Sequence, residues 1–432
     1  MCGIGSYSRQ RAVGAPRFNA GLYKLRAWRG VHSRGNHVRQ HPVRAVKRLH
    51  GWRVIGRIGR AIVLCGLLSS CLDMQHTLAD QGNSEPIAGR LLAVVHNPYA
   101  EVDWAGDRRL KVQLHDHAGI DLRQLASYDA AGYDAVSLMT YSGVASLGKS
   151  WKERHWPPED WLPRAFLDSL RSIKLFIPSG EEVGRGHITS SFMTTYIALW
   201  QPAYYPQREP WHYGSTQECI DLIRTYGGIP ILAHPWLYYD HPGGVSRFAG
   251  IEVYSAYVPG AVYQGILQEG AANFVGVWDS VLSSDASVIG IAVNDHYGPY
   301  WTGRGSDSKI RDSGKTIVLA PELTLAALQE RLAAGAAFAV KDFGVQKDRY
   351  PVVRSIVVGD STIDIEADGD IRWIGNGSLV GEGHLLDIRS LPAGTRYVRA
   401  EISNTEGSVV FTQAFGLGTR EPSGHTGRGR PV

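Results

Sequence analysis

Histidine and carboxylate residues recur along the 432-residue chain at positions where they could bind metal ions. His115 and His117 stand two apart on an extended segment, so both side chains leave the same face and can reach one ion. The further candidates follow other apolar runs and are Glu182, His187, His234 and Asp295. Imidazole and carboxylate ligands suit Zn, Mn or Fe without choosing among these metals. The set predicts a metal-binding site.

Short apolar runs precede these residues and predict buried strands. The runs are LKVQL at 110–114, YDAVSLM at 133–139, IKLFI at 173–177, IPILA at 229–233, IEVY at 251–254 and VIGIAV at 288–293. Because uninterrupted apolar strands that alternate with helices are typical of a parallel sheet covered on both faces, we expect an α/β barrel or an open sheet. The carboxyl ends of parallel barrel strands open on one face, where side chains from distant parts of the chain converge. One buried histidine is more often a core residue, but four such strand ends favour a shared site.

Local signals also predict two helices and the orientation of one candidate ligand. Ser215 and Glu218 match a capping box at the start of an amphipathic stretch. An apolar stripe of leucines between 325 and 332 predicts a second helix. Pro235 restricts the backbone of the preceding residue, so we expect it to fix where the His234 side chain points.

The helical pattern stops after Asp342, and strand-like segments follow. They are VVRSIVV at 352–358, TIDIEA at 362–367, RYVRAEIS at 396–403 and SVVFTQAF at 408–415. Gly, Asp and Asn turns separate them, which predicts a small β-sandwich over residues 346–419. We therefore assign residues 89–342 to the site-bearing domain and expect residues 420–432 to form a disordered tail.

Charge is distributed unevenly along the chain. Residues 1–60 hold fourteen Lys and Arg and no acidic residue, which leaves 31 basic and 41 acidic residues for the rest. That main body carries a net charge of −10. Because phosphate neutralisation needs clustered Lys and Arg, this balance argues against a nucleic-acid partner.

The basic start leads into the apolar run AIVLCGLL at 61–68 and then Ser69, Ser70 and Cys71, an order typical of a secretory leader. The last residues resemble a bacterial lipobox, which implies cleavage before Cys71 and acylation of its thiol. We predict a leader at 1–70, a tether at 71–88 and an exported lipoprotein, anchored to a membrane and facing the periplasm or the cell exterior. Cleavage by an ordinary signal peptidase is the alternative, and a misassigned start is one interpretation of residues 1–45.

Several motifs resemble one known family in their order. They are NPYAEVDWAGDRRLKVQLHDHAG at 97–119, GYDAVSLMTYSG at 132–143, GEEVGRGH, GGIPILAHP and GIAVND, with LTLAALQERLAAGAAFAV and RYVRAEISNTEGSVVFTQAF downstream. The chain resembles the PHP family (polymerase and histidinol phosphatase domain), in particular its CehA/McbA-like branch, over about residues 90–419. The resemblance implies a distorted (β/α)7 barrel with a metal cluster that hydrolyses phosphate esters, or sometimes other esters.

By matching motifs, the resemblance also assigns roles to individual residues. It implies the metal ligands His115, His117, Glu182, His187, His234 and Asp295. Glu182 would bridge two metal ions, and Glu182, Asp295 and Tyr141 would take part in catalysis. Glu252 matches a recurrent acidic position, which we interpret as a structural partner near the rim of the site.

Departures from the family pattern predict the number of metal ions. Thr140 and Tyr141 stand where the family's second motif carries Asp-His, and the ungapped last motif ends in Tyr297. These losses fall on the third ion of three-metal members, so we predict two bound ions. His296 is an alternative ligand if the local alignment shifts.

The leading hypothesis is a membrane-tethered, metal-dependent hydrolase of a small-molecule phosphoester that uses a hydroxide activated by two metals. A carboxylic or carbamate ester is the alternative substrate. The competing class is a non-catalytic surface module, in which a decayed metal site supports binding and the β-sandwich docks a glycan or a partner.

Overall fold

The computed structural model of the chain describes residues 91–116, 122–137, 162–179, 188–193, 215–235, 244–256, 272–295, 312–344 and 347–420. All of these residues belong to one compact unit, Glu85–Val432. The predicted leader and tether with Cys71, and the tail at 421–432, lie outside the described residues.

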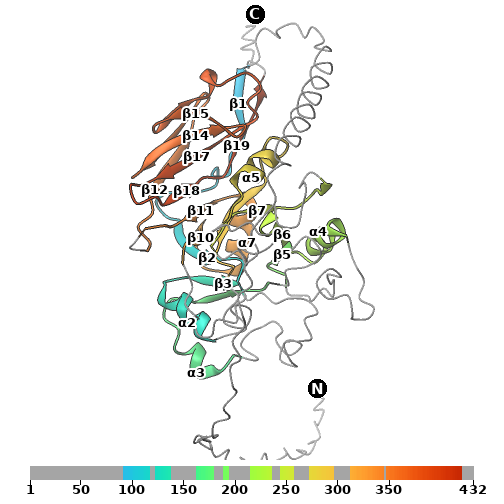
Figure 1. Cartoon of the computed structure of the whole chain (residues 1–432), viewed down its shortest axis with the longest axis vertical. Coiled ribbons are helices and arrows are strands. Elements are labelled where there is room, and N and C mark those ends of the chain that lie inside the picture. Colours follow the sequence, from blue (N-terminus) through green and yellow to red (C-terminus); the bar gives the residue numbers. More distant parts are fainter. Residues whose placement is uncertain are drawn as a thin grey trace, which may run out of the picture. The chain divides into compact units, whose positions relative to one another are not determined.

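Strands dominate the described part of the chain, and eleven of them form the largest sheet (Figure 1). Its strands, in spatial order, are β1 (Leu91–His96), β19 (Phe415–Arg420), β17 (Tyr397–Ser403), β18 (Val409–Phe411), β11 (Ala337–Lys341), β10 (Gly314–Ala320), β2 (Arg108–Gln113), β3 (Ala135–Ser137) and β4 (Leu175–Ile177), with β14 (Asp370–Gly375) on β17 and β15 (Ser378–Glu382) on β14. The strands β2, β3 and β4 pair in parallel, whereas β10 pairs antiparallel with both β2 and β11.

Two smaller sheets complete the described strands. One contains β5 (Ile188–Ser191), β6 (Ile229–Leu232), β7 (Gly250–Ser255) and β8 (Ala272–Asn273), with β9 (Ile289–Val293) on β7. The other contains β12 (Val353–Val358), β13 (Thr362–Ala367) and β16 (Leu385–Asp387). Within the first, β6 and β9 both pair in parallel with β7, so the carboxyl ends of three strands meet at one edge.

The fold is therefore mixed α/β, as predicted, but richer in strands and in antiparallel pairs than the sequence pattern indicated. The predicted apolar runs correspond to β2, β3, β4, β6, β7 and β9. The described strands do not close into a barrel by continuous pairing. The (β/α)7 barrel and the separate C-terminal β-sandwich thus stay predictions.

The described helices are α2 (Leu122–Ala130), α3 (Arg164–Leu167), α4 (Thr216–Thr225), α5 (Val275–Leu282), α7 (Leu325–Ala334) and the 3-10 turn η8 (Ile388–Ser390). The predicted capping box is confirmed, because the Ser215 side chain accepts a hydrogen bond from the Glu218 N–H and Glu218 accepts one from the Ser215 N–H. Helix α7 ends at Gly335, whose φ of 80° favours glycine. None of the helices in the described segments is long and apolar enough to cross a membrane.

One hydrophobic core joins the two larger sheets. Its buried members include Leu110 and Val112 of β2, Ile231 of β6, and Ile289 and Ile291 of β9. Burial of these side chains holds β9 of the five-stranded sheet against the eleven-stranded sheet. The ends of β2 and β9 therefore lie close together.

Side chains of the larger sheet also bond the β9 backbone. The Gln413 side chain accepts from the Gly290 N–H at 2.7 Å and donates to its carbonyl at 2.8 Å. The Thr316 hydroxyl donates to the Ala292 carbonyl at 3.0 Å. These bonds satisfy buried N–H and C=O groups of the β9 backbone. Among the described strands, β9 pairs only with β7, so its other edge has no strand partner there.

The first and last described strands pair with each other. β1 runs antiparallel to β19, with Leu91 opposite Arg420 and His96 opposite Gly416 (Figure 1). The start of the predicted site-bearing domain is therefore bonded to the end of the C-terminal region.

Candidate metal centre

Three of the predicted ligands converge in the structure: His115, His234 and Asp295. Their ligand atoms all lie within 4.8 Å of one another. Asp295 Oδ1 is 3.2 Å from His115 Nε2, and Asp295 Oδ2 is 3.6 Å from His234 Nε2. The three side chains are buried, with at most 1% of each exposed.

Each of the three residues occupies the same position relative to its strand. His115 stands two residues beyond β2, His234 two residues beyond β6 and Asp295 two residues beyond β9. Strands that point the same way bring their carboxyl ends to a common edge, as the sequence predicted for these residues. The convergence of these three side chains is confirmed.

The backbone at two of these residues departs from ordinary conformations. His234 has a φ of 28° and Asp295 a φ of 51°. A residue before proline usually has extended backbone, and the φ of His234 differs from that preference. The His234 N–H donates to Glu252 Oε2 at 2.8 Å, and this bond holds the residue in a conformation that proline would disfavour. Left-handed backbone costs roughly 1–2 kcal/mol per residue and is often found at functional sites.

Glu252 contacts both histidines. Its Oε1 lies 2.5 Å from His115 Nδ1, and its Oε2 accepts the His234 N–H. Glu252 is thus a structural partner of the ligands, as the sequence predicted, but it is fully buried within β7 and does not lie at an exposed rim. A carboxylate on Nδ1 favours the tautomer that leaves Nε2 as the acceptor, which is the form that binds a metal.

Backbone bonds tie the segment of His115 to that of Asp295. The Asp295 N–H donates to the His115 carbonyl at 3.0 Å. The Gln113 Oε1 accepts from the N–H groups of both His115, at 3.2 Å, and Asn294, at 3.4 Å. One side chain thus holds two ligand-bearing loops together.

Helix α2 anchors the residue next to His115. Asp116 is buried and accepts a hydrogen bond from Gln124 Nε2 at 2.5 Å and another from the Tyr128 hydroxyl. Burial and the Asp116 charge together raise the pKa of Tyr128, which keeps this phenol protonated as a donor. Because Asp116 is held from the helix side, the adjacent His115 is restrained as well.

The geometry of the three donors fits one divalent ion. Metal–ligand bonds of about 2.0–2.2 Å place two donors of one ion roughly 3–4 Å apart. The distances from Asp295 to the two histidines lie in that range. Two imidazoles and one carboxylate suit Zn, Mn or Fe, and three protein ligands are typical of catalytic sites that keep a position for water.

The remaining predicted site residues lie outside the described residues. They are His117, Glu182, His187, His296 and Tyr141. The second metal position and the predicted number of ions therefore stay predictions.

Sequence reasoning missed Gln113 as a support of the ligands, and it left the contacts of Glu252 with the two histidines unassigned. Gln113 and Glu252 each interrupt an otherwise apolar strand, in LKVQL and IEVY. A polar side chain within a buried strand needs a buried partner, so this interruption was an available signal. No comparable local signal distinguishes Asp116 from an exposed aspartate.

No known protein-family model matches the sequence, and no curated protein matches it either. Two solved structures are similar to the chain. A two-domain protein from Bacteroides vulgatus, which contains a predicted PHP-like metal-dependent phosphoesterase, is 16% identical over 74% of this chain and 98% of its own, with a TM-score of 0.36. PsfC from Pseudomonas syringae is 12% identical over 52% of this chain and 88% of its own, with a TM-score of 0.31. Sequence identities and TM-scores this low carry no argument about function. The function is therefore inferred from the geometry of the site.

Proposed function

We propose that the chain is a metal-dependent hydrolase that acts on a phosphoester. The observation that carries the proposal is the shared contact of Glu252 with His115 and His234, both within reach of Asp295. A buried carboxylate that orients a histidine is the usual support of a metal-ligating imidazole.

The residues would have different roles in such a site. His115, His234 and Asp295 would hold the ion, and Glu252 would keep the Nδ1 proton on His115 so that Nε2 faces the metal. A bound divalent ion supplies a Lewis acid and water of lowered pKa. Burial of the three ligands limits competing water, which strengthens their electrostatic interactions.

The substrate class and the finer family assignment rest on the sequence motifs. The motif at 97–119, and those that end at His234 and at Asp295, resemble the CehA/McbA-like branch of the PHP family. That resemblance supports a phosphoester as substrate and a second ion, bridged to the first by Glu182 and with His187 and His234 as its histidine ligands. We also propose that Tyr141 donates a hydrogen bond to the substrate or to a metal ligand.

The test combines metal binding with turnover. Metal-stripped protein is titrated with Mn²⁺ or Zn²⁺, and p-nitrophenyl phosphodiesters, monoesters and acetate are then assayed. His234→Ala should abolish tight binding and turnover. His384→Ala is the matched control, because His384 also contacts a carboxylate, Asp364 at 2.9 Å, but is exposed.

The outcomes separate the function classes. Phosphoester turnover by the wild type, retained in His384→Ala and lost in His234→Ala, supports the proposal. Turnover of acetate alone would indicate the carboxylic ester alternative. A wild type that binds metal but never exceeds His234→Ala in turnover would indicate a non-catalytic binding module.

We also propose that the protein is exported and anchored through Cys71. The support is the order of basic residues, apolar run and small residues before Cys71 in the sequence. Cys71→Ala should release the protein from membranes or block its processing. Unchanged membrane association with normal cleavage would contradict the lipid anchor.

A further inference from the structure

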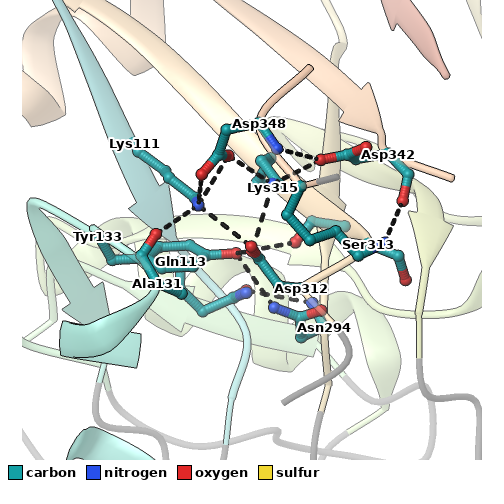
Figure 2. A network of polar contacts seen from close by, with 12 residues as sticks. Lys111, Gln113, Ala131, Tyr133, Asn294, Asp312, Ser313, Lys315, Asp342 and Asp348 are labelled. Atoms are coloured by element: carbon teal, nitrogen blue, oxygen red, sulfur yellow. Dashed lines mark hydrogen bonds and ion pairs between the residues drawn. The ribbon is translucent and has the colours of Figure 1, made fainter. Parts of the chain in front are cut away.

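A network of charged side chains, buried except for the half-exposed Asp348, lies beside the metal centre (Figure 2). Lys111 Nζ contacts Asp348 at 2.8 Å and Asp312 at 3.3 Å. Lys315 Nζ contacts Asp348 at 2.7 Å, Asp342 at 2.9 Å and Asp312 at 3.3 Å. Asp312 therefore lies between two ammonium groups, which fixes its carboxylate in one place.

The network reaches the metal centre through a single tyrosine. The buried Tyr133 hydroxyl donates to Asp312 Oδ1 at 2.8 Å and accepts from Asn294 Nδ2 at 3.1 Å. Asn294 directly precedes Asp295, the carboxylate ligand. Figure 2 shows Tyr133, Asp312 and Asn294 meeting at this point.

The two ends of this link share an unusual backbone conformation. Asp295 has a φ of 51° and Asp312 a φ of 50°, both in the left-handed region. A Cβ atom at Gly314 would lie 2.0 Å from the Val293 carbonyl oxygen, so the two backbones are in close contact there. Strained backbone at both ends persists only when surrounding contacts hold it.

Burial of this many charges is expensive unless every charge is paired. Burial and the neighbouring Lys315 lower the pKa of Lys111, whereas the surrounding aspartates raise that of Lys315 despite its burial. Burial alone would raise the pKa of Asp342 and Asp348, yet the ammonium groups lower both. The carboxylates therefore stay ionised, and the network is rigid near neutral pH.

We propose that Tyr133 and Asp312 are positioning residues for the metal ligand Asp295. Asp312, held by Lys111 and Lys315, fixes the Tyr133 hydroxyl, and that hydroxyl fixes Asn294 and hence the direction of the Asp295 side chain. The inference rests on the proposed function, because it assumes that Asp295 binds a metal.

The test is the Mn²⁺ or Zn²⁺ affinity of the full chain, measured by calorimetry on metal-stripped protein. Tyr133→Phe removes only the hydroxyl and keeps the edge contact with the Tyr128 ring, whose centroid is 4.9 Å away. Loss of a supporting hydrogen bond typically costs about 10- to 100-fold in metal affinity, and we expect at least tenfold weaker binding.

Tyr397→Phe is the matched control. The Tyr397 hydroxyl is buried and donates to Asp279 Oδ1 at 2.7 Å, and Asp279 keeps its arginine partner, as Asp312 keeps its lysines. Both variants should lose similar folding stability, but Tyr397→Phe should bind metal within about twofold of the wild type.

A second variant keeps the test decisive if Tyr133→Phe does not fold. Asn294→Ser removes the amide that bonds Tyr133 and should weaken metal binding to a similar extent. Because the two residues act in one chain of contacts, the double variant should bind no more weakly than either single variant. Wild-type affinity in folded Tyr133→Phe or Asn294→Ser, or additive losses in the double variant, would overturn the inference. A wild type that binds no metal would instead overturn the proposed function.

Discussion

Replacement of Glu252 by glutamine tests directly whether this carboxylate holds the two metal-binding histidines in place. The carboxylate faces two donors, His115 Nδ1 at 2.5 Å and the His234 N–H at 2.8 Å. Glutamine has one acceptor oxygen and one NH2 group, so one of these donors must face another donor. Either the His115 tautomer changes or the His234 backbone shifts.

The expected loss follows from the contacts. A hydrogen bond to a charged group contributes about 1.5–3 kcal/mol, and each 1.4 kcal/mol corresponds to about tenfold in affinity. We therefore expect Glu252→Gln to bind Mn²⁺ or Zn²⁺ about 10- to 100-fold more weakly, as for other residues that orient metal ligands. Removal of a fully buried charge offsets part of the lost bonding in the metal-free protein. The free energy of unfolding of metal-free Glu252→Gln should differ from that of the metal-free wild type by less than about 1 kcal/mol.

Calorimetric titration of metal-stripped protein measures the affinity, and urea unfolding without metal measures the stability. Glu401→Gln is the control, because Glu401 accepts a hydrogen bond from Arg399 at 2.8 Å on strand β17 and contacts no ligand residue among the described contacts. Glu252→Gln with metal affinity within twofold of the wild type would refute the reasoning.

Three further predictions concern stability. Asp342→Asn should destabilise the fold at pH 7 by about 1.5–3 kcal/mol, because Lys315 loses one charged partner but keeps Asp312 and Asp348. The folded pKa of Asp342 is lowered, so this contribution is present above the unfolded value of 3.8 and lost as pH falls through the folded pKa. Urea unfolding should show the variant and the wild type converging below pH 3.8, and a gap independent of pH would contradict this. Ser215→Ala removes the N-cap of α4 and should cost about 1 kcal/mol in the same assay, whereas no change would show that the cap is dispensable. Arg399→Met leaves the Asp279 carboxylate without its guanidinium and should cost about 3–5 kcal/mol, and equal thermal midpoints would disprove that role.

Two helices and part of the strands of the described region could be predicted from local patterns. The runs at 229–233 and 288–293 are continuous apolar segments, and they form β6 and β9. The Ser215 cap is equally local, since its partner is Glu218. Such signals involve residues that are neighbours in the chain, so a short stretch of sequence contains all of the interacting groups.

The three candidate ligands could be predicted because each follows such a strand. The strands before His234 and Asp295 both pair in parallel with β7, so their ends meet as predicted, whereas β2 before His115 belongs to the larger sheet and reaches them only because the two sheets pack together. Local reasoning failed at the His234 backbone, where a long-range bond to Glu252 outweighs the preference imposed by Pro235.

Only the tertiary structure decided which distant groups meet. β1 pairs with β19, Glu252 supports two histidines from other strands, and Lys111 lies beside Asp348. A buried lysine has the same letter in the sequence as an exposed one, and Asp348 stands 237 residues away from Lys111. Which of them meet depends on how the sheets pack, because only packing excludes water and makes an unpaired charge costly.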